Sequence, residues 1–348
     1  MKKSNKLDKE DLKKLDVWRG ALALLITIVH STQLYHPKNL VNEKGQQLLD
    51  IVGYSGVLGF FFLSGMVIVL SLEKNYERNG KLDFKEYFIA RFARIYPPLI
   101  FSILFCVVIK YIVVFGGFLH MKDNYMFSYR DLIDFLLMIK VSLGNVNAPL
   151  WTLILEWWFY FIGFFIYLIL KQKKILSKIL TAIIVIYLTT LMYKLNDNAA
   201  NYLIIWVLGA VYGYFINSNI FRKVMTYISL ALFVFFIFIY NSVLTHVDLS
   251  KSLYLQLLLT VLFAGVALKI PYIKFFSSSA KYSYSLYILH YPFFLFISTI
   301  TYNFVQDNML INLGVYFISL VLLYVLSYFV SIYFENKNYY ANLINKYF

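Results

Sequence analysis

Long apolar runs alternate with short polar segments along the whole chain. Each run approaches the roughly 20 residues that an α-helix needs to cross the hydrocarbon core of a bilayer. We count ten runs, at Trp18–Tyr35, Val52–Leu72, Ile95–Phe115, Leu150–Leu170, Ile175–Tyr193, Asn201–Phe215, Val224–Tyr240, Leu253–Leu268, Tyr282–Thr301 and Leu310–Phe334. The pattern predicts an all-α membrane protein, a polytopic bundle of about ten transmembrane helices.

The segments between the runs predict a simple organisation. A shorter apolar run, Leu132–Leu143, is typical of an interfacial or re-entrant helix within the longest loop. We find no linker, low-complexity tract or clear internal repeat. We therefore expect a single domain over residues 1–348, with cytoplasmic ends at residues 1–14 and 335–348.

The charged residues between the runs predict the orientation. If the N-terminus is placed inside and the runs alternate, lysines and arginines of the inside segments outnumber those of the outside loops by about three to one. This asymmetry predicts that both ends of the chain lie in the cytoplasm. It also supports the count of ten, because one missed helix would reverse every later loop.

Composition places most of the chain in lipid. Of the 348 residues, 61% are hydrophobic and only 14% are charged, which a soluble core could not accommodate. The net charge of +14 does not indicate a nucleic-acid partner, because the basic residues stand in short loops between apolar runs. The lipid bilayer is the expected partner. The single cysteine, Cys106, excludes an internal disulfide, and we predict no metal site.

Charge inside a predicted span is costly and marks function by default. Four of the ionisable residues that fall inside the spans are candidates on this ground: Arg19, His30, Glu156 and His290. Arg19 and His30 share one face of the first span but stand about 16 Å apart along its axis. Helix rise places His30 and Glu156 both about 20 Å above the inner surface of a ~30 Å core, and His290 about 12 Å above it.

Similar depths allow the two histidines and the carboxylate to meet near the middle of the membrane. Such a group suits general base catalysis, in which a carboxylate orients an imidazole. Two structural alternatives stay open: either histidine can be a hydrogen-bond partner between helices, and Glu156 can pair with an arginine.

Arg91 and Arg94 stand at the inner end of the third span, on one helix face. Paired guanidinium groups suit a phosphate-bearing ligand, although interfacial anchors, Arg19 among them, show the same pattern. The small residues from Gly53 to Gly65 favour close helix packing over admission of a substrate between helices.

Five segments, in order, resemble motifs of the acyltransferase-3 family of integral membrane acyltransferases. The first is an Arg and a His separated by ten residues, here Arg19 and His30. The others are a Gly-, Phe- and Ser-containing second-helix motif, an Arg-x-x-Arg element, a Trp-Ser-Leu-x-x-Glu-x-x-Phe-Tyr segment and a late-helix motif. The matching ranges are Gly56–Gly65, Arg91–Pro97, Trp151–Tyr160 (with Thr in place of the Ser) and Lys281–Pro292.

The resemblance covers nearly the whole chain and implies a ten-helix bundle. It implies transfer of an acyl group, commonly acetyl from acetyl-CoA, to a hydroxyl of an extracytoplasmic sugar. The acceptor would be a cell-surface glycan or a lipid-linked sugar, and the location a bacterial cytoplasmic membrane. The chain then works as a stand-alone membrane domain, and a homodimer stays open.

The resemblance and the depths together assign site residues. We expect His30, Arg19, Glu156 and His290 to be catalytic, with His30 either the general base or a carrier of the acyl group. We expect Arg91, Arg94, Arg19 and Lys281 to hold the phosphates of acetyl-CoA. The expected substrate cavity is formed by Trp151, Ser64, Tyr160, Ser283 and Tyr284.

Three positions depart from the family pattern. Leu58 replaces the usual acid of the second helix, Met66 replaces a Phe, and Ala280 replaces a Gly. These departures affect substrate detail more than family.

Two other functions remain compatible with deep ionisable groups. One is a transporter or flippase of a lipid-linked saccharide, which would be expected to show internal repeats. The other is a membrane acyltransferase of another family, with an acylated lipid as its product.

Overall fold

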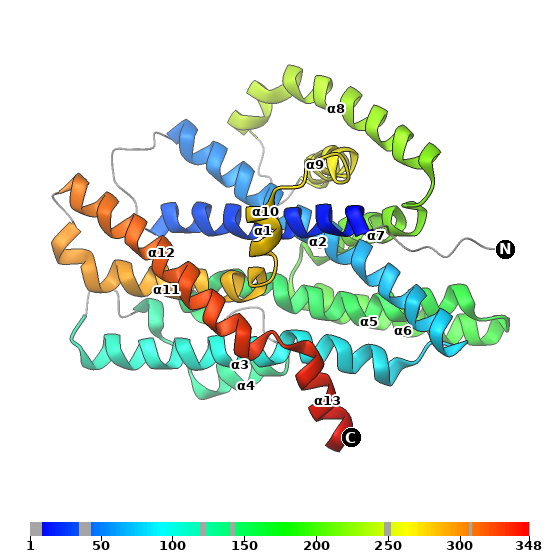
Figure 1. The fold of residues 1–348 in the computed structure, drawn as a ribbon, viewed down its shortest axis with the longest axis horizontal. Coiled ribbons are helices and arrows are strands. Elements are labelled where there is room, and N and C mark those ends of the chain that lie inside the picture. Colours follow the sequence, from blue (N-terminus) through cyan, green and yellow to red (C-terminus); the bar gives the residue numbers. More distant parts are fainter. Residues whose placement is uncertain are drawn as a thin grey trace. The chain divides into compact units, whose positions relative to one another are not determined.

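The computed structural model describes residues 9–34, 43–118, 123–139, 143–246, 252–305 and 308–347. Its regular elements are helices, and no strand occurs within these ranges. Figure 1 shows the elements in chain order. They are α1 (Lys9–Leu34), α2 (Glu43–Asn79), α3 (Phe84–Phe115), α4 (Tyr129–Leu136), the 3₁₀ helix η2 (Gly144–Leu150), α5 (Trp151–Lys171), α6 (Ile175–Leu195), α7 (Ala199–Phe215), α8 (Asn219–His246), α9 (Leu253–Val266), α10 (Lys274–Ser279), α11 (Ser283–Val305), α12 (Met309–Phe334) and α13 (Lys337–Tyr347).

Long apolar helices dominate the described chain. Seven helical stretches there are long and apolar enough to cross a membrane: those containing α2, α3, α5, α6, α8, α11 and α12. Two further apolar helices, α7 and α9, are shorter. Each of the ten predicted runs corresponds to one of these helices or to α1, so the prediction of an all-α membrane protein is confirmed.

Several helices extend beyond the apolar runs that predicted them. Helix α2 begins at Glu43 and α3 begins at Phe84, well before the predicted starts at Val52 and Ile95. The added turns of α2 contain Glu, Lys, Gln and Leu, and those of α3 contain Lys, Glu, Ala and Arg, all of which are good helix formers whatever their hydropathy. As a result Asp50, predicted in a loop, lies within α2.

The predicted helix Leu132–Leu143 is placed too late in the chain. The helix that forms, α4, begins after Ser128, whose hydroxyl accepts from the backbone N–H of Asp131 while the Asp131 carboxylate accepts from the backbone N–H of Ser128. This capping box sets the start of the helix. It ends at Leu136, and residues 140–142 of the prediction lie outside the described ranges.

The chain forms two compact units, each built from three separate segments. The first unit comprises Met1–Leu22, Tyr54–Phe88 and Leu155–Ser278, and the second comprises Ala23–Gly53, Ile89–Ile154 and Ser279–Phe348. Helices α1, α2, α3 and α5 each contribute to both units. The units are described separately below.

In the first unit, α2 and α7 approach each other so closely that only glycine fits. A Cβ on Gly65 would lie 1.9 Å from the backbone oxygen of Trp206, and one on Gly209 would lie 2.0 Å from the backbone oxygen of Phe62. Leu58 and Met66, two departures from the family pattern, are buried on the same helix α2. For Gly65, the packing interpretation of the small residues is therefore confirmed.

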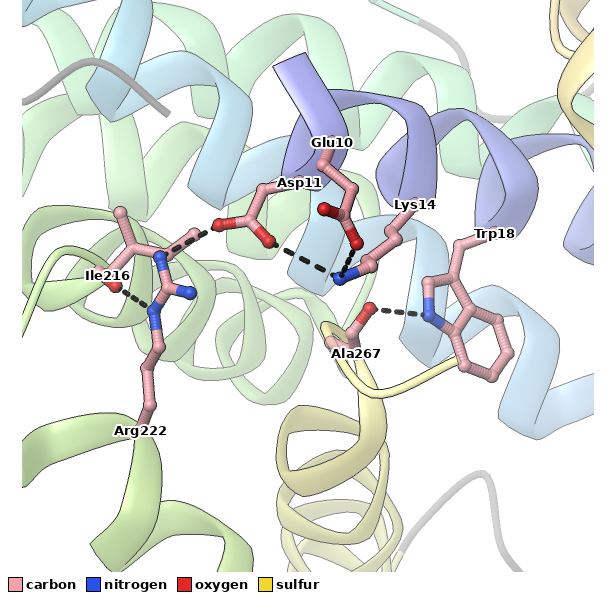
Figure 2. A network of polar contacts seen from close by, with 7 residues as sticks. All are labelled: Glu10, Asp11, Lys14, Trp18, Ile216, Arg222 and Ala267. Carbon is pink, nitrogen blue, oxygen red and sulfur yellow. Dashed lines mark hydrogen bonds and ion pairs between the residues drawn. The ribbon is translucent and has the colours of Figure 1, made fainter. Parts of the chain in front are cut away.

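A polar network holds the beginning of α1 in the first unit (Figure 2). Asp11 is buried, and its carboxylate accepts a hydrogen bond from the guanidinium of Arg222 at 2.8 Å. Arg222 also donates to the backbone oxygen of Ile216. The indole N–H of Trp18 donates to the backbone oxygen of Ala267 at 2.8 Å, at the end of α9. The start of α1 is thus fixed by specific polar contacts.

In the second unit, α11 packs against α12 and η2. The N-terminus of α11 is capped by Glu335, which follows α12: its Oε1 accepts from the backbone N–H of Ser285 at 2.8 Å and from its hydroxyl at 2.6 Å. A carboxylate at this end also complements the helix dipole. After Glu335 the chain turns into α13 (Figure 1).

The α2–α7 crossing yields a stability prediction. Replacing Gly65 by Ala forces a methyl group against the backbone of α7. A backbone cannot move aside by changing rotamer, so we expect the free energy of unfolding to fall by about 1–3 kcal/mol or more. Thermal unfolding in detergent, monitored by size-exclusion chromatography, measures this loss. Gly314→Ala is the matched control, because a Cβ there meets nothing within 4 Å. Equal melting temperatures of Gly65→Ala and Gly314→Ala would contradict the close approach of α2 and α7 at Gly65.

Candidate functional site

Two histidines from opposite ends of the chain meet in the second unit. The rings of His30, on α1, and His290, on α11, stack with centroids 5.3 Å apart and planes inclined by 27°. Tyr291 packs edge-on against His30 at 5.7 Å. The structure therefore brings together two of the residues that their similar predicted depths singled out.

A short chain of hydrogen bonds holds His30. Its Nδ1 lies 2.9 Å from Oε1 of Gln33, one turn later on α1. The Gln33 amide nitrogen donates to Oδ1 of Asp50 on α2 at 3.0 Å, and Gln46 donates to the same oxygen at 2.9 Å. Neither Gln33 nor Asp50 was predicted from the sequence as a site residue, although the i, i+3 spacing from His30 is a signal for Gln33.

His290 is held by its own helix. Its Nδ1 lies 2.5 Å from the backbone oxygen of Tyr287, so this nitrogen carries the proton and donates. The side chain is fully buried, and its Nε2 has no hydrogen-bond partner among the described residues. A buried acceptor without a donor is rare and calls for an explanation such as a ligand or an internal water molecule.

A proline removes one backbone hydrogen bond of α11 beside His290. Pro292 has no N–H, so the backbone oxygen of Ile288, four residues earlier, has no donor in its own helix. Two buried side chains replace that donor. The Asn147 amide nitrogen donates to the Ile288 oxygen at 2.9 Å, and so does the Ser102 hydroxyl, also at 2.9 Å. This contact joins η2, α3 and α11.

Tyr287 links the same turn of α11 to the beginning of α5. Its hydroxyl donates to the backbone oxygen of Pro149 at 2.8 Å and contacts the Thr152 hydroxyl. Thr152 belongs to the Trp-Thr-Leu motif, and Trp151, a predicted cavity residue, is the first residue of α5. The motif at the start of α5 therefore packs against the motif that contains His290.

The predicted donor-binding arginines also lie in the second unit. Arg91 is 9% exposed, and Arg94, one turn later on α3, is half-buried. The Tyr284 hydroxyl donates to the backbone oxygen of Ile95, which places the start of α11 beside this turn. Lys281 is exposed and lies in the turn directly before α11, three residues from Tyr284. Three cationic side chains thus come from two adjoining segments.

Glu156 belongs to the first unit, and its placement beside His30 stays a prediction. There Oε1 of Glu156 accepts from the Ser64 hydroxyl at 2.9 Å and from the Tyr160 hydroxyl at 2.5 Å. The Trp206 indole donates to Ser64 at 3.2 Å, which joins α7 to the group. Two predicted cavity residues, Ser64 and Tyr160, are thus hydrogen-bond partners of Glu156.

Arg19 and Ser283 make local contacts. Arg19, in the first unit, pairs with Asp16 at 3.2 Å, a partly exposed i, i+3 pair of small energetic value. Ser283, in the second, donates to the backbone oxygen of Ala280 at 3.0 Å in the turn that begins α11. Their roles in catalysis and in the cavity stay predictions.

The chemistry available in the second unit is that of neutral imidazole. Each histidine has an acceptor at Nδ1, which leaves a lone pair on Nε2. A lone pair of this kind accepts a proton from a hydroxyl or a hydrogen bond from a donor. Among the described residues, no group of three or more His, Cys, Asp or Glu could hold a metal ion.

Comparison with known proteins gave one match. The model of the acyltransferase-3 family, described as an acyltransferase domain, matches residues 12–334. Searches of curated proteins and of solved structures found no match. The matched range contains all the motifs discussed above.

The Ile288 contact yields a prediction with a built-in control. Asn147→Leu removes one of the two donors to a buried carbonyl and should lower stability by about 0.5–1.5 kcal/mol, because Ser102 still donates to it. In a Pro292→Ala background the restored backbone N–H of residue 292 can bond Ile288, so the same change should have a smaller effect. A double-mutant cycle on thermal unfolding in detergent measures the coupling. If the stability changes of Asn147→Leu and Pro292→Ala simply add in the double variant, the Ile288 carbonyl does not depend on Asn147.

Proposed function

Because the chain belongs to the acyltransferase-3 family and is therefore a membrane acyltransferase, we propose that it is an O-acetyltransferase. The donor is cytoplasmic acetyl-CoA, and the acceptor is a hydroxyl of an extracytoplasmic cell-surface glycan or lipid-linked sugar. The single observation that carries the proposal is the pair of stacked histidines, one of them the His of the Arg-x₁₀-His motif.

The proposed setting is a bacterial cytoplasmic membrane. The whole chain, 1–348, acts as one domain that crosses the membrane ten times with both ends in the cytoplasm. Helices α1, α7 and α9 add to the seven that meet the length and composition of a span. The distribution of lysine and arginine supports this orientation.

In the proposed reaction His30 acts as the general base. Its Nε2 takes the proton of the acceptor hydroxyl while that oxygen attacks the thioester carbonyl carbon of acetyl-CoA. The carbon–sulfur bond then breaks, and the CoA thiolate leaves and takes up the proton held by His30. The products are the O-acetyl ester and free CoA. The Nδ1 contact with Gln33 supports a tautomer whose Nε2 is the base.

The cationic residues would hold the donor. Arg91, Arg94 and Lys281, with Arg19, would bind the phosphates of acetyl-CoA on the inner side, as guanidinium groups favour phosphate oxygens. We place Trp151, Ser283, Tyr284 and the Glu156, Ser64 and Tyr160 group along the substrate path. Family membership favours this function over the transporter alternative.

Acetyl transfer should depend on His30. Purified protein in liposomes, given radiolabelled acetyl-CoA and a panel of bacterial glycans, should label a glycan, and His30→Ala should reduce the rate at least about a hundredfold because the base is lost. Thr190→Ala, on α6, is the control that should keep the wild-type rate. Full transfer by folded His30→Ala would exclude His30 as the base. Movement of a glycan without any donor would instead favour a transporter.

Donor binding should depend on the arginines of α3. Arg94→Gln should raise KM for acetyl-CoA about tenfold, since a charge-assisted hydrogen bond to phosphate is worth about 1.5–3 kcal/mol. The double variant with Arg91→Gln should raise it further, with kcat much less affected. Lys173→Gln removes an exposed cation from the segment between α5 and α6 and serves as the control. An unchanged KM in the double variant would place the phosphates elsewhere.

A further inference from the structure

The hydrogen bonds around His30 involve residues of a kind that can fix a tautomer. An amide has a donor end and an acceptor end, whereas a carboxylate only accepts. The Gln33 nitrogen faces Asp50 and its oxygen faces Nδ1 of His30. If the amide were turned round, its oxygen would face the carboxylate, and two acceptors would oppose each other. Asp50 therefore sets the direction of the Gln33 amide.

The direction of the amide in turn sets the proton on His30. Because the Gln33 oxygen can only accept, Nδ1 of His30 must donate to it. A neutral imidazole with its proton on Nδ1 has its lone pair on Nε2. The other tautomer would leave two acceptors 2.9 Å apart. Stacking on His290, with the two ring planes inclined by 27°, also restricts the orientation of the His30 ring.

Asp50 is itself held in place. Gln46, one turn earlier on α2, donates to the same Oδ1 at 2.9 Å. The group therefore crosses from α1 to α2 near the end of α1, before residues 35–42. Asp50 and Gln33 are exposed, so this end of the group is open to solvent and substitution there does not disturb a packed core.

We propose that Gln33 and Asp50 are positioning residues that act through His30: Asp50 orients the Gln33 amide, which holds the Nδ1 proton of His30 and presents Nε2 to the acceptor hydroxyl. The inference rests on the proposed role of His30 as the base. It assigns the orienting carboxylate to Asp50, a role that the sequence analysis assigned to Glu156.

A spectroscopic test addresses the tautomer without any activity. Protein labelled with ¹⁵N in its histidines and reconstituted in lipid gives nitrogen shifts that separate a protonated from a bare ring nitrogen, and His30→Ala identifies the His30 signals. The wild type should show His30 with Nδ1 protonated. Gln33→Leu and Asp50→Asn should each show a mixture of tautomers. A bare Nδ1 in the wild type would overturn the proposal.

A kinetic test addresses positioning. Gln33→Leu should lower kcat by about ten- to a hundredfold, with KM for both substrates nearly unchanged, because a base of the wrong tautomer binds substrate but does not take the proton. Gln47→Leu changes an exposed glutamine of the same α2 turn and should leave kcat and the tautomer unchanged.

An exchange of the two groups provides the decisive variant. In Gln33→Glu with Asp50→Asn, the new carboxylate can accept from Nδ1 and the new amide can donate to it. The double variant should therefore recover most of the kcat that Asp50→Asn loses. If Gln33→Leu loses the Nδ1-protonated tautomer of His30 but keeps full kcat, the positioning role is overturned. The role is also overturned if the double variant does not restore kcat. Failure of every variant and of the wild type to transfer acetyl would instead reject the proposed function, while the nitrogen shifts would still test the contacts.

Discussion

Inside a bilayer no water satisfies the backbone, so each carbonyl that loses its helical donor must find another within the protein. Pro292 creates such a carbonyl at Ile288. Asn147 and Ser102 both donate to it, and so three segments far apart in the chain converge two residues from His290. Without these donors the missing N–H of Pro292 would leave a polar group unsatisfied in apolar surroundings, at a penalty of several kcal/mol. The proline and its two donors thus depend on one another.

His290 is held by a bond within its own helix. Its Nδ1 donates to the backbone oxygen of Tyr287, one turn earlier on α11. Both stacked rings then donate from Nδ1. Two imidazolium charges with ring centroids 5.3 Å apart would repel each other. When His30 takes a proton, a His290 that stays neutral avoids this repulsion and can still offer its Nε2 as an acceptor.

The sequence predicts the helices well, because a bilayer imposes a length and an apolar composition that are readable locally. It also identifies His30 and His290, because deep ionisable groups are conspicuous in apolar runs. It does not identify Gln33, Asp50, Asn147 or Ser102 as site residues. A polar residue near a helix end is unremarkable in sequence, and a donor that reaches a proline-freed carbonyl on another helix leaves no local pattern. The start of α2 is missed for a related reason: its first turns are helical by propensity and not by hydropathy.

The geometry of α3 bears on the kind of donor. Arg91 and Ser102 lie on this one helix, eleven positions apart, which corresponds to about 16 Å of helix rise. Ser102 contacts the Ile288 oxygen beside the imidazole pair, whereas Arg91 lies about 16 Å away along the helix axis. A donor whose phosphates bind at Arg91 and Arg94 and whose acyl group reaches His30 must therefore carry its acyl group on a long arm. Acyl-CoA has such an arm between its phosphates and its thioester. A compact acyl phosphate, whose reactive carbonyl is bonded directly to the phosphate, is too short to occupy both ends, so the spacing along α3 fits the thioester donor of the proposed function.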